Sequence, residues 1–308
     1  MDKTKKNLHG LFLVNKDVGI TSHDVVYRLR KILGISSIGH SGTLDPIAGG
    51  LLVMLVGEAT KLSQYILEGD KSYQLEMQLG LQTDTFDITG EKLKEVIVDI
   101  SQEEIQKTLV HFSGEKEWPV PIHSAIKVKG KKLYEYARSD QEVEVPKKKM
   151  KFWNVEFLSQ EQNRVQIHLH CSKGSYIRTW INEFGLKLGC GATMTQLTRT
   201  TSVPFELGQA FTLNQIENTL KNNDSLSCFI PLEHALPGAK KIRVKGQDQR
   251  LLKNGQISHD LKLKLIHACN PEIDRLIFVT SNESEPLALI GFEEHVGFSI
   301  RRVFHFES

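Results

Sequence analysis

The sequence lacks the features that mark several classes of protein. Its 308 residues include only four cysteines, which are widely spaced and form no C-x-x-C pair; this disfavours a disulfide framework and a zinc site and favours a reducing compartment. No apolar run approaches the roughly 20 residues that span a bilayer, and the charged N-terminus has no apolar signal core. We therefore expect a cytoplasmic protein with no membrane partner.

An excess of charge of one sign is also missing. The 39 basic and 37 acidic side chains give a net charge of +2, which excludes a polycation that coats nucleic acid through its total charge. The charges are nevertheless segregated, because residues 121–151 carry nine Lys/Arg against four acids and residues 84–118 carry nine acids against four lysines. Such runs are usually solvated faces, but the basic run, with Tyr134 and Tyr136 interleaved, also has the composition of a phosphate-binding track.

What is present is a pattern of short strands with few helices. Hydrophobic periodicity predicts strands at 11–14, 51–56, 72–79, 122–128, 152–158, 165–171 and 194–197, and helices at 22–33, 58–67, 101–110 and 176–188. Because the two do not alternate regularly, an α+β fold with a mixed or antiparallel central sheet is favoured over a doubly wound one.

The pattern changes near residue 231. After a linker-like stretch at 231–241, further strand patterns at 262–267, 276–280, 287–292 and 300–306 predict a small all-β module. The expected domains are therefore residues 10–236 and residues 240–308.

A glycine-rich segment, residues 34–50, is predicted to be a loop with Asp45-Pro46 near its centre. Asp-Pro is common turn chemistry, so Asp45 taken alone would more often be structural than catalytic. The surrounding glycines let a bulky ligand approach the backbone, and the buried strand that follows gives the carboxylate a rigid base. No phosphate-binding glycine motif is present, so the candidate chemistry is a carboxylate nucleophile aided by basic and aromatic groups elsewhere.

A second cluster, residues 171–179, combines a strand end, a glycine turn and a helix start. Arg178 falls in the first helical turn, where the helix dipole favours acids over bases. Two interpretations remain open from the residues alone: an exposed, solvated arginine, or one that pairs with a buried carboxylate in a bidentate fork.

At these motifs the sequence resembles the TruB family of RNA pseudouridine synthases, over most of residues 10–200. The resemblance rests on the order and number of the following segments: Gly10–Ser22, Gly39–Pro46, Gly57–Lys61, Lys71–Tyr73, Gly80–Gly90, Pro121–Lys127, Lys132–Arg138, Ser172–Thr179 and Gly189–Ala192. It implies the pseudouridine synthase fold, a PUA-like RNA-binding domain at 240–308, and an isomerase that converts uridine 55 in the T-arm of tRNA to pseudouridine.

The resemblance also implies a set of catalytic residues. Asp45 matches the aspartate that adds covalently to the flipped nucleotide, at C1′ or at C6, after which the uracil leaves N1, turns and rejoins the ribose through C5. Tyr73 matches a tyrosine that lies against the target base. Arg178 matches the arginine that pairs with the catalytic carboxylate and keeps it ionised. No cofactor and no metal are implied.

Further residues match substrate-binding positions of the family. Leu197 matches the hydrophobic residue that packs on the uracil, and His40 matches the side chain that enters the T-loop. Tyr176, Lys16 and Asp87 are secondary pocket candidates. Without the resemblance, Leu197 would be plain core and a single loop histidine would be uninformative.

Two other classes of function are weighed against this one. A non-catalytic tRNA-binding or tRNA-folding protein would use the same base-flipping pocket, whereas a glycoside-type hydrolase would need a second carboxylate across the scissile bond. The chain departs from the family pattern at Asp17, at Gly49 and at Ser139-Asp140, none of which is a predicted catalytic group. The expected partner is the T-arm stem-loop of tRNA, bound by a monomer without an obligate protein partner.

Overall fold

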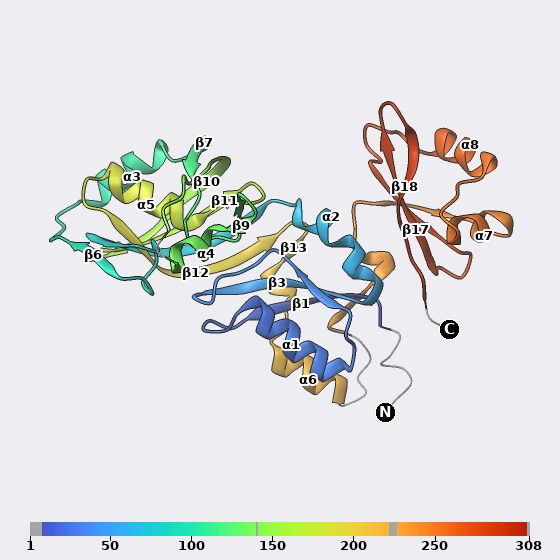
Figure 1. The fold of residues 1–308 in the computed structure, drawn as a ribbon, viewed down its shortest axis with the longest axis horizontal. Helices are drawn as coiled ribbons and strands as arrows, with labels where there is room; N and C mark the ends of the chain where they lie inside the picture. The colour runs from blue at the N-terminus through green and yellow to red at the C-terminus, as the bar shows by residue number, and fades with distance from the viewer. Residues whose placement is uncertain (1–7, 140, 222–226, 307–308) are drawn as a thin grey trace.

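The computed structural model describes residues 8–139, 141–221 and 227–306 (Figure 1). Its centre is a ten-stranded sheet in the order β14-β1-β3-β12-β4-β11-β10-β7, with β2 paired to β3 and β13 paired to β12. All of these pairings are antiparallel except β3 with β12. The predicted α+β fold with a mixed central sheet is therefore confirmed.

The strands of this sheet span most of the chain up to residue 231. They are β1 (Gly10–Lys16), β2 (Ile38–Ser41), β3 (Ala48–Val56), β4 (Lys71–Leu79), β7 (Gly114–Pro119), β10 (Lys147–Glu161), β11 (Arg164–Cys171), β12 (Ala192–Ser202), β13 (Phe205–Glu206) and β14 (Phe229–Pro231). Two short hairpins lie outside it: β5 (Leu81–Thr83) with β6 (Lys92–Glu95), and β8 (Lys127–Val128) with β9 (Lys131–Lys132).

Helices lie on both faces of the sheet, because each of the two hydrophobic clusters that its strands share also contains helical residues. The α-helices of this part are α1 (Ser22–Leu33), α2 (Ser63–Leu67), α3 (Gln102–Val110), α4 (Leu133–Arg138), α5 (Ile177–Lys187) and α6 (Leu213–Lys221), and the 3-10 helices are η2 (Gly57–Leu62), η3 (Leu207–Gln209) and η4 (Leu232–His234). Helix α1 begins at a capping box formed by Thr21 and Asp24 and ends at the left-handed Gly34. Helices α1 and α6 pack together beside β1, and α5 packs on β12 (Figure 1).

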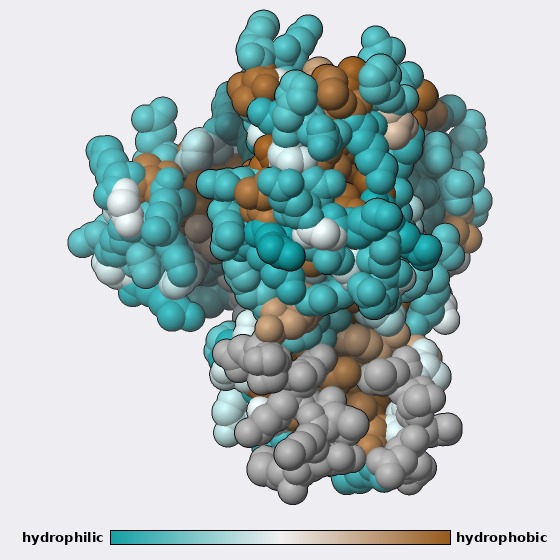
Figure 2. Space-filling model, turned by 90° about the vertical axis from the view of Figure 1, so that its right-hand side faces the viewer, coloured by the Kyte–Doolittle hydropathy of each residue, from teal (hydrophilic) through white to brown (hydrophobic). Residues whose placement is uncertain are grey.

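The C-terminal region forms a second, smaller sheet. Its strands β15 (Lys240–Arg243), β16 (Leu276–Thr280), β17 (Pro286–Glu293) and β18 (Gly297–Val303) are joined by α7 (Gln247–Lys253) and α8 (His259–Ala268). Phe278, Leu289 and Phe304 share a core with residues of β1 and β3. The end of the molecule that this region forms is mostly hydrophilic, with hydrophobic residues in separate small groups (Figure 2).

The prediction that this region is entirely β was wrong. Residues 262–267, predicted as a strand, lie in helix α8, where Ser258 caps the N-terminus and Leu261 and Leu265 are buried one helical turn apart. Leu263 lies between them and is exposed. The leucines at alternate positions therefore do not share one face of a strand, and only those one helical turn apart are buried. The linker-like stretch was also misjudged, because Leu232 and Ala235 are fully buried in the shared core.

Three further predictions needed correction. The segment 34–50 is not all loop, since β2 forms within it and pairs with β3. Residues 122–128 are strand only at Lys127–Val128, because the preceding residues form a loop that contacts α5. The alternation of apolar and polar residues at 72–79 predicts that Glu76 faces solvent, but on β4 it is buried by hydrogen-bonding neighbours on β11 and β12. No helix of the described residues is long and apolar enough to cross a bilayer.

Candidate active site

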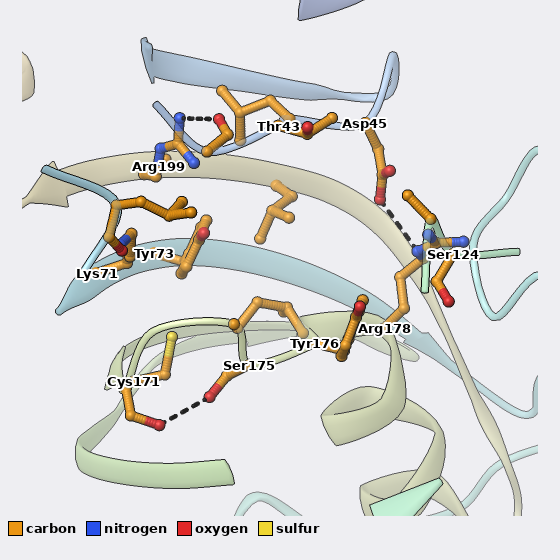
Figure 3. Close-up of a pocket in the computed structure, with 18 of the residues that line it drawn as sticks. Thr43, Asp45, Lys71, Tyr73, Ser124, Cys171, Ser175, Tyr176, Arg178 and Arg199 are labelled. Atoms are coloured by element: carbon orange, nitrogen blue, oxygen red, sulfur yellow. Dashed lines mark hydrogen bonds and ion pairs between the residues drawn. The ribbon is translucent and has the colours of Figure 1, made fainter. Parts of the chain in front are cut away.

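A cavity of about 470 Å³ opens where the loop before β3 meets β4, β12 and the start of α5 (Figure 3). Its lining includes Asp45, Tyr73, Tyr176, Arg178 and Leu197, five of the eight predicted site residues. They come from four separate parts of the chain. The cavity therefore brings together groups that are up to 152 positions apart in the sequence.

Asp45 is held in a tight turn. The Leu44 backbone N–H donates to Ser22 Oγ (2.9 Å), and Ser22 Oγ donates to the Leu44 carbonyl (3.1 Å), which ties the turn to helix α1. The Ala48 N–H then donates to the Asp45 carbonyl (3.0 Å). With its backbone fixed on both sides, the carboxylate projects into the cavity, where 39% of the side chain is exposed.

Arg178 lies opposite this carboxylate (Figure 3). Its Nε is 3.1 Å from Asp45 Oδ2, and its Nη1 is 3.4 Å from Asp87 Oδ2. The same guanidinium donates to the carbonyls of Thr85 (3.2 Å) and His123 (3.1 Å). Of the two interpretations that the sequence left open, the arginine is therefore the paired one, with only 8% of the residue exposed. The predicted bidentate fork is not formed, because a single nitrogen of Arg178 contacts each of the two carboxylates.

Asp87 supports the arginine from behind. It is 4% exposed and does not line the cavity. Its Oδ1 accepts hydrogen bonds from Thr85 Oγ1 (3.0 Å), from the Thr89 N–H (3.0 Å) and from the Thr89 hydroxyl. These bonds leave Oδ2 directed at Arg178, so Asp87 orients the arginine and does not itself face the substrate space.

Two tyrosines and a leucine form another part of the cavity wall. Burial raises the pKa of Tyr73 and of Tyr176, so both phenols are neutral at physiological pH and act as hydrogen-bonding groups. Leu197 is 7% exposed and lies opposite Leu75 in the β12–β4 pairing, two residues from Tyr73 on the same side of the sheet. A planar base would meet aromatic and aliphatic groups here.

Arg199 is a site residue that the sequence reasoning missed. It lines the cavity, is 1% exposed, and donates from Nε to the Leu51 carbonyl (2.7 Å) and from Nη2 to the Gly42 carbonyl (3.1 Å). It thereby ties strand β12 to the loop that carries Asp45. Its position two residues after Leu197 on a strand was the available signal, since alternate residues share a face.

Lys16 and His40 do not line the cavity. Lys16 is 1% exposed, and its Nζ donates to the carbonyls of Asp17 (3.0 Å) and Ile20 (2.7 Å), so it closes the turn after β1. His40 lies on β2, where burial and the neighbouring Arg199 lower its pKa. Imidazole at this position is therefore neutral at physiological pH.

Asp17, Gly49 and Ser139, three of the departures from the family pattern, are not among the residues that line the cavity. A Cβ at Gly49 would stand 3.3 Å from both the Lys16 carbonyl oxygen and Val18 Cγ2, so the glycine permits a close approach of the turn that contains Asp17. Ser139 follows helix α4 and donates to the Glu135 carbonyl (2.8 Å). Asp140 lies outside the described residues.

Lys71 is a buried cation at one end of the cavity. Its Nζ donates to the carbonyls of Leu67 (2.5 Å) and Gly69 at the end of α2. Burial, with the nearby Arg199 as a smaller cause, lowers the pKa of Lys71 to about 8. Between this value and its unfolded pKa, the unfolded chain binds the proton and the native chain does not, so native stability rises with pH there.

We therefore expect the free energy of unfolding to rise by up to about 2 kcal/mol from this group between pH 7 and pH 9.5. Urea unfolding of the wild-type protein and of Lys71→Met at both pH values measures it. The methionine variant should lack this part of the pH dependence, and an equal pH dependence in both proteins would contradict the assignment.

Metal ligands do not converge within the described part of the chain: no group of three or more His, Cys, Asp or Glu side chains there could hold an ion. His168 and His170 share a face of β11, with ring centroids 5.1 Å apart, and His170 Nδ1 is 2.9 Å from Ser72 Oγ.

Comparisons with known proteins find relatives over nearly the whole chain. The N-terminal domain of the TruB family of pseudouridylate synthases matches residues 30–177, and the C-terminal domain of tRNA pseudouridylate synthase B matches residues 178–237. The chain is 54% identical over 304 residues to tRNA pseudouridine synthase B of Bdellovibrio bacteriovorus, covering 98% of this chain and 99% of the relative. It is 37% identical over 300 residues to the protein of that name from Staphylococcus saprophyticus, covering 93% and 95%.

Solved structures agree at the level of the fold. A crystal structure of a Cbf5-Nop10-Gar1 complex superposes with a TM-score of 0.67 at 24% identity, covering 97% of this chain and 84% of the other. An H/ACA RNP bound to a substrate RNA containing 2′-deoxyuridine gives 0.69 at 21% identity, covering 99% and 92%. The predicted pseudouridine synthase fold is thus confirmed, and with the curated relatives it follows that the chain belongs to the TruB family of tRNA pseudouridine synthases, which are isomerases.

Proposed function

We propose that this enzyme converts uridine 55 in the T-arm of tRNAs to pseudouridine in the cavity around Asp45. The observation that carries the proposal is the chain of contacts Asp45–Arg178–Asp87, which holds a single partly exposed carboxylate at the wall of a cavity lined by Tyr73 and Leu197. The relatives named tRNA pseudouridine synthase B support tRNA as the substrate.

The proposed chemistry is an isomerisation in which atoms and electrons balance within the substrate. The Asp45 carboxylate adds to the flipped nucleotide, and attack at C1′ or at C6 leads to the same overall result. The N1–C1′ bond breaks, the uracil turns, a C5–C1′ bond forms, and the bond to Asp45 breaks, which regenerates the carboxylate. The C5 proton is lost while N1 gains one. Tyr73 and Leu197 hold the ring between an aromatic and an aliphatic surface during the turn.

The cavity disfavours the hydrolase alternative. Glycoside hydrolysis requires two carboxyl groups on opposite sides of the scissile bond. Among the described residues that line the cavity, Asp45 is the only carboxylate, and its partner is an arginine.

The basic run supports a path for the RNA backbone towards this cavity. Tyr134 lines the cavity, and the charges of Lys132 and Arg138 each lie 5.4 Å from its ring centroid. Lys131 lies 4.8 Å from the ring centroid of Tyr136. We include in the proposal that these cations contact phosphates, that residues 240–308 form a PUA-like RNA-binding domain, and that the protein acts as a cytoplasmic monomer.

A direct assay tests the proposal. A tRNA transcript labelled with tritium at C5 of its uridines should release label on incubation with the purified protein, and the same transcript with cytidine at position 55 should release none. A transcript with cytidine in place of another T-arm uridine is the control. Release that persists without uridine 55 would refute the site specificity.

The same transcripts distinguish an enzyme from the alternative function, a non-catalytic protein that binds or folds tRNA. Inserting His40 into the T-loop would by itself bias tRNA folding, so binding without any release would favour that alternative.

Binding should also depend on salt. If cations on residues 127–138 contact phosphates, we expect log K for tRNA to fall linearly with log[salt], because each contact releases condensed counterions. Filter binding at several salt concentrations measures the slope, and Lys131→Gln should make it shallower by about one contact or less. A flat plot would contradict a phosphate track.

A further inference from the structure

Strand β12 carries two cavity residues, Leu197 and Arg199, between two irregularities in its pairing with β4. Met194 pairs with Met77 and Gln196 with Glu76, so Thr195 is an extra residue without a partner. A second extra residue, at position 200, follows Arg199. These are β-bulges, which occur preferentially beside active sites, where they redirect side chains.

The first bulge decides which way the two cavity residues face. Met194 is buried in the core, and Leu197, three positions later, also faces inward. In a regular strand, residues three apart point to opposite faces. Without the extra residue at 195, Leu197 and Arg199 would therefore point to the outer face of the sheet, away from Asp45.

A buried carboxylate on the neighbouring strand holds this bulge. Thr195 Oγ1 donates to the Glu76 carbonyl (3.1 Å) and to Glu76 Oε1 (2.8 Å). The Glu76 side chain is 9% exposed and also accepts from Arg164 Nη1 (2.8 Å) and Gln166 Nε2 (3.2 Å). Burial alone would raise the pKa of Glu76, but these hydrogen bonds outweigh burial and lower it, so the carboxylate is ionised at neutral pH.

Arg199 connects the bulged strand to the loop that carries Asp45. Arg199 donates to the Gly42 carbonyl (3.1 Å), three residues before Asp45 in the same loop. A Cβ at Gly42, whose φ is +84°, would lie 3.3 Å from Arg199 Nη1, so the loop and the guanidinium are closely packed. A change in the path of β12 therefore moves both the wall that faces the base and the loop that presents the carboxylate.

We propose that Glu76 and Thr195 are positioning residues, which act from the outer face of the sheet by holding the bulge that turns Leu197 and Arg199 into the cavity. The proposal rests on the proposed function, because it takes this cavity as the active site. Neither residue touches substrate, so the expected effect is on turnover and not on the affinity for tRNA.

The experiment uses the full chain with Thr195→Val, which keeps the shape of the side chain and removes the hydroxyl. We expect the single-turnover rate of pseudouridine formation to fall about tenfold, the effect of one hydrogen bond to a charged group when it acts on turnover. The dissociation constant for tRNA should stay within about twofold. Thr195→Ser restores the hydroxyl and should recover most of the rate.

Two variants separate positioning from general stability. Glu76→Gln weakens the acceptor of the bulge contact and should slow turnover in the same way. Arg164→Gln removes another donor to the same carboxylate, on the β11 side, and should lower the unfolding midpoint without slowing the folded enzyme. If Thr195→Val unfolds at lower temperature but turns over at the wild-type rate, the positioning role is refuted.

The outcome is distinguishable from a failure of the proposed function. If Asp45→Asn retains wild-type turnover, the cavity is not the active site and the proposed function fails. A second outcome is that Asp45→Asn is inactive while Thr195→Val, Thr195→Ser and Glu76→Gln all turn over at the wild-type rate. In that case only the role of the bulge contact fails.

Discussion

Asp45→Asn is expected to abolish pseudouridine formation, by at least ~10³-fold in turnover, while tRNA binding is retained. The asparagine amide is close in size to the carboxylate and can still approach Arg178, but it carries no negative charge and is a poor nucleophile. Because the Asp45 turn is held through backbone groups and Ser22, the local structure should survive the change. Tritium release from labelled tRNA measures the rate, and filter binding measures the affinity.

Asp17→Asn is the matched control for this experiment. Asp17 is an exposed carboxylate in the turn after β1, outside the cavity lining, and it is also one of the departures from the family pattern. We expect its rate to be close to that of the wild-type protein. Equal activity of Asp45→Asn and wild type would remove Asp45 from the mechanism, whereas a loss of tRNA affinity in Asp45→Asn would point to a binding role.

Local features of this fold could be predicted from local sequence. Helix α1 spans the predicted residues 22–33, between its N-cap Thr21 and its C-cap Gly34, and the capping box at Ser101 opens α3 at the start of the predicted helix 101–110. These signals act within a few residues, so no tertiary contact is needed to interpret them. The same local reasoning failed for α8, because its apolar spacing fits both a strand and a helix. Its buried residues are those that pack on the C-terminal sheet, a tertiary contact that the local sequence does not show.

The candidate site was less accessible to residue-by-residue reasoning. Asp45 and Arg178 are each ambiguous alone, and their proximity depends on the parallel pairing of β3 with β12 and on the packing of α5 on β12. The family resemblance implied the pair of Asp45 and Arg178, which the structure contains. The bulge at Thr195 was missed, because a single extra residue in a strand breaks the alternation on which the sequence reasoning depended. Arg199 was missed because the predicted strand ended at residue 197, two positions before it.

Arg178→Met is expected to reduce turnover by about 10³-fold and to destabilise the protein by about 3–5 kcal/mol. Methionine fills a similar volume but leaves Asp87, which is 4% exposed, without its cationic partner. It also leaves the Thr85 and His123 carbonyls without the donors that now bind them, so three loops lose a common anchor. Urea unfolding and single-turnover assays measure the two effects separately.

Asp87→Asn tests whether the buried carboxylate that supports Arg178 is needed for turnover. The asparagine removes the buried charge that contacts Arg178 Nη1. The ion pair between Arg178 Nε and Asp45 Oδ2, 3.1 Å long in the wild-type protein, then loses the group that orients the arginine. We therefore expect a smaller loss of turnover, about 10- to 100-fold, since a misplacement of the order of 1 Å has effects of this size. Asp17→Asn, at the exposed carboxylate outside the cavity lining, is the matched control for loss of a carboxylate charge. If Asp87→Asn were as active as the control, the arginine would hold its position without the buried carboxylate, and the geometry at Asp45 would depend on the Thr85 and His123 carbonyls alone.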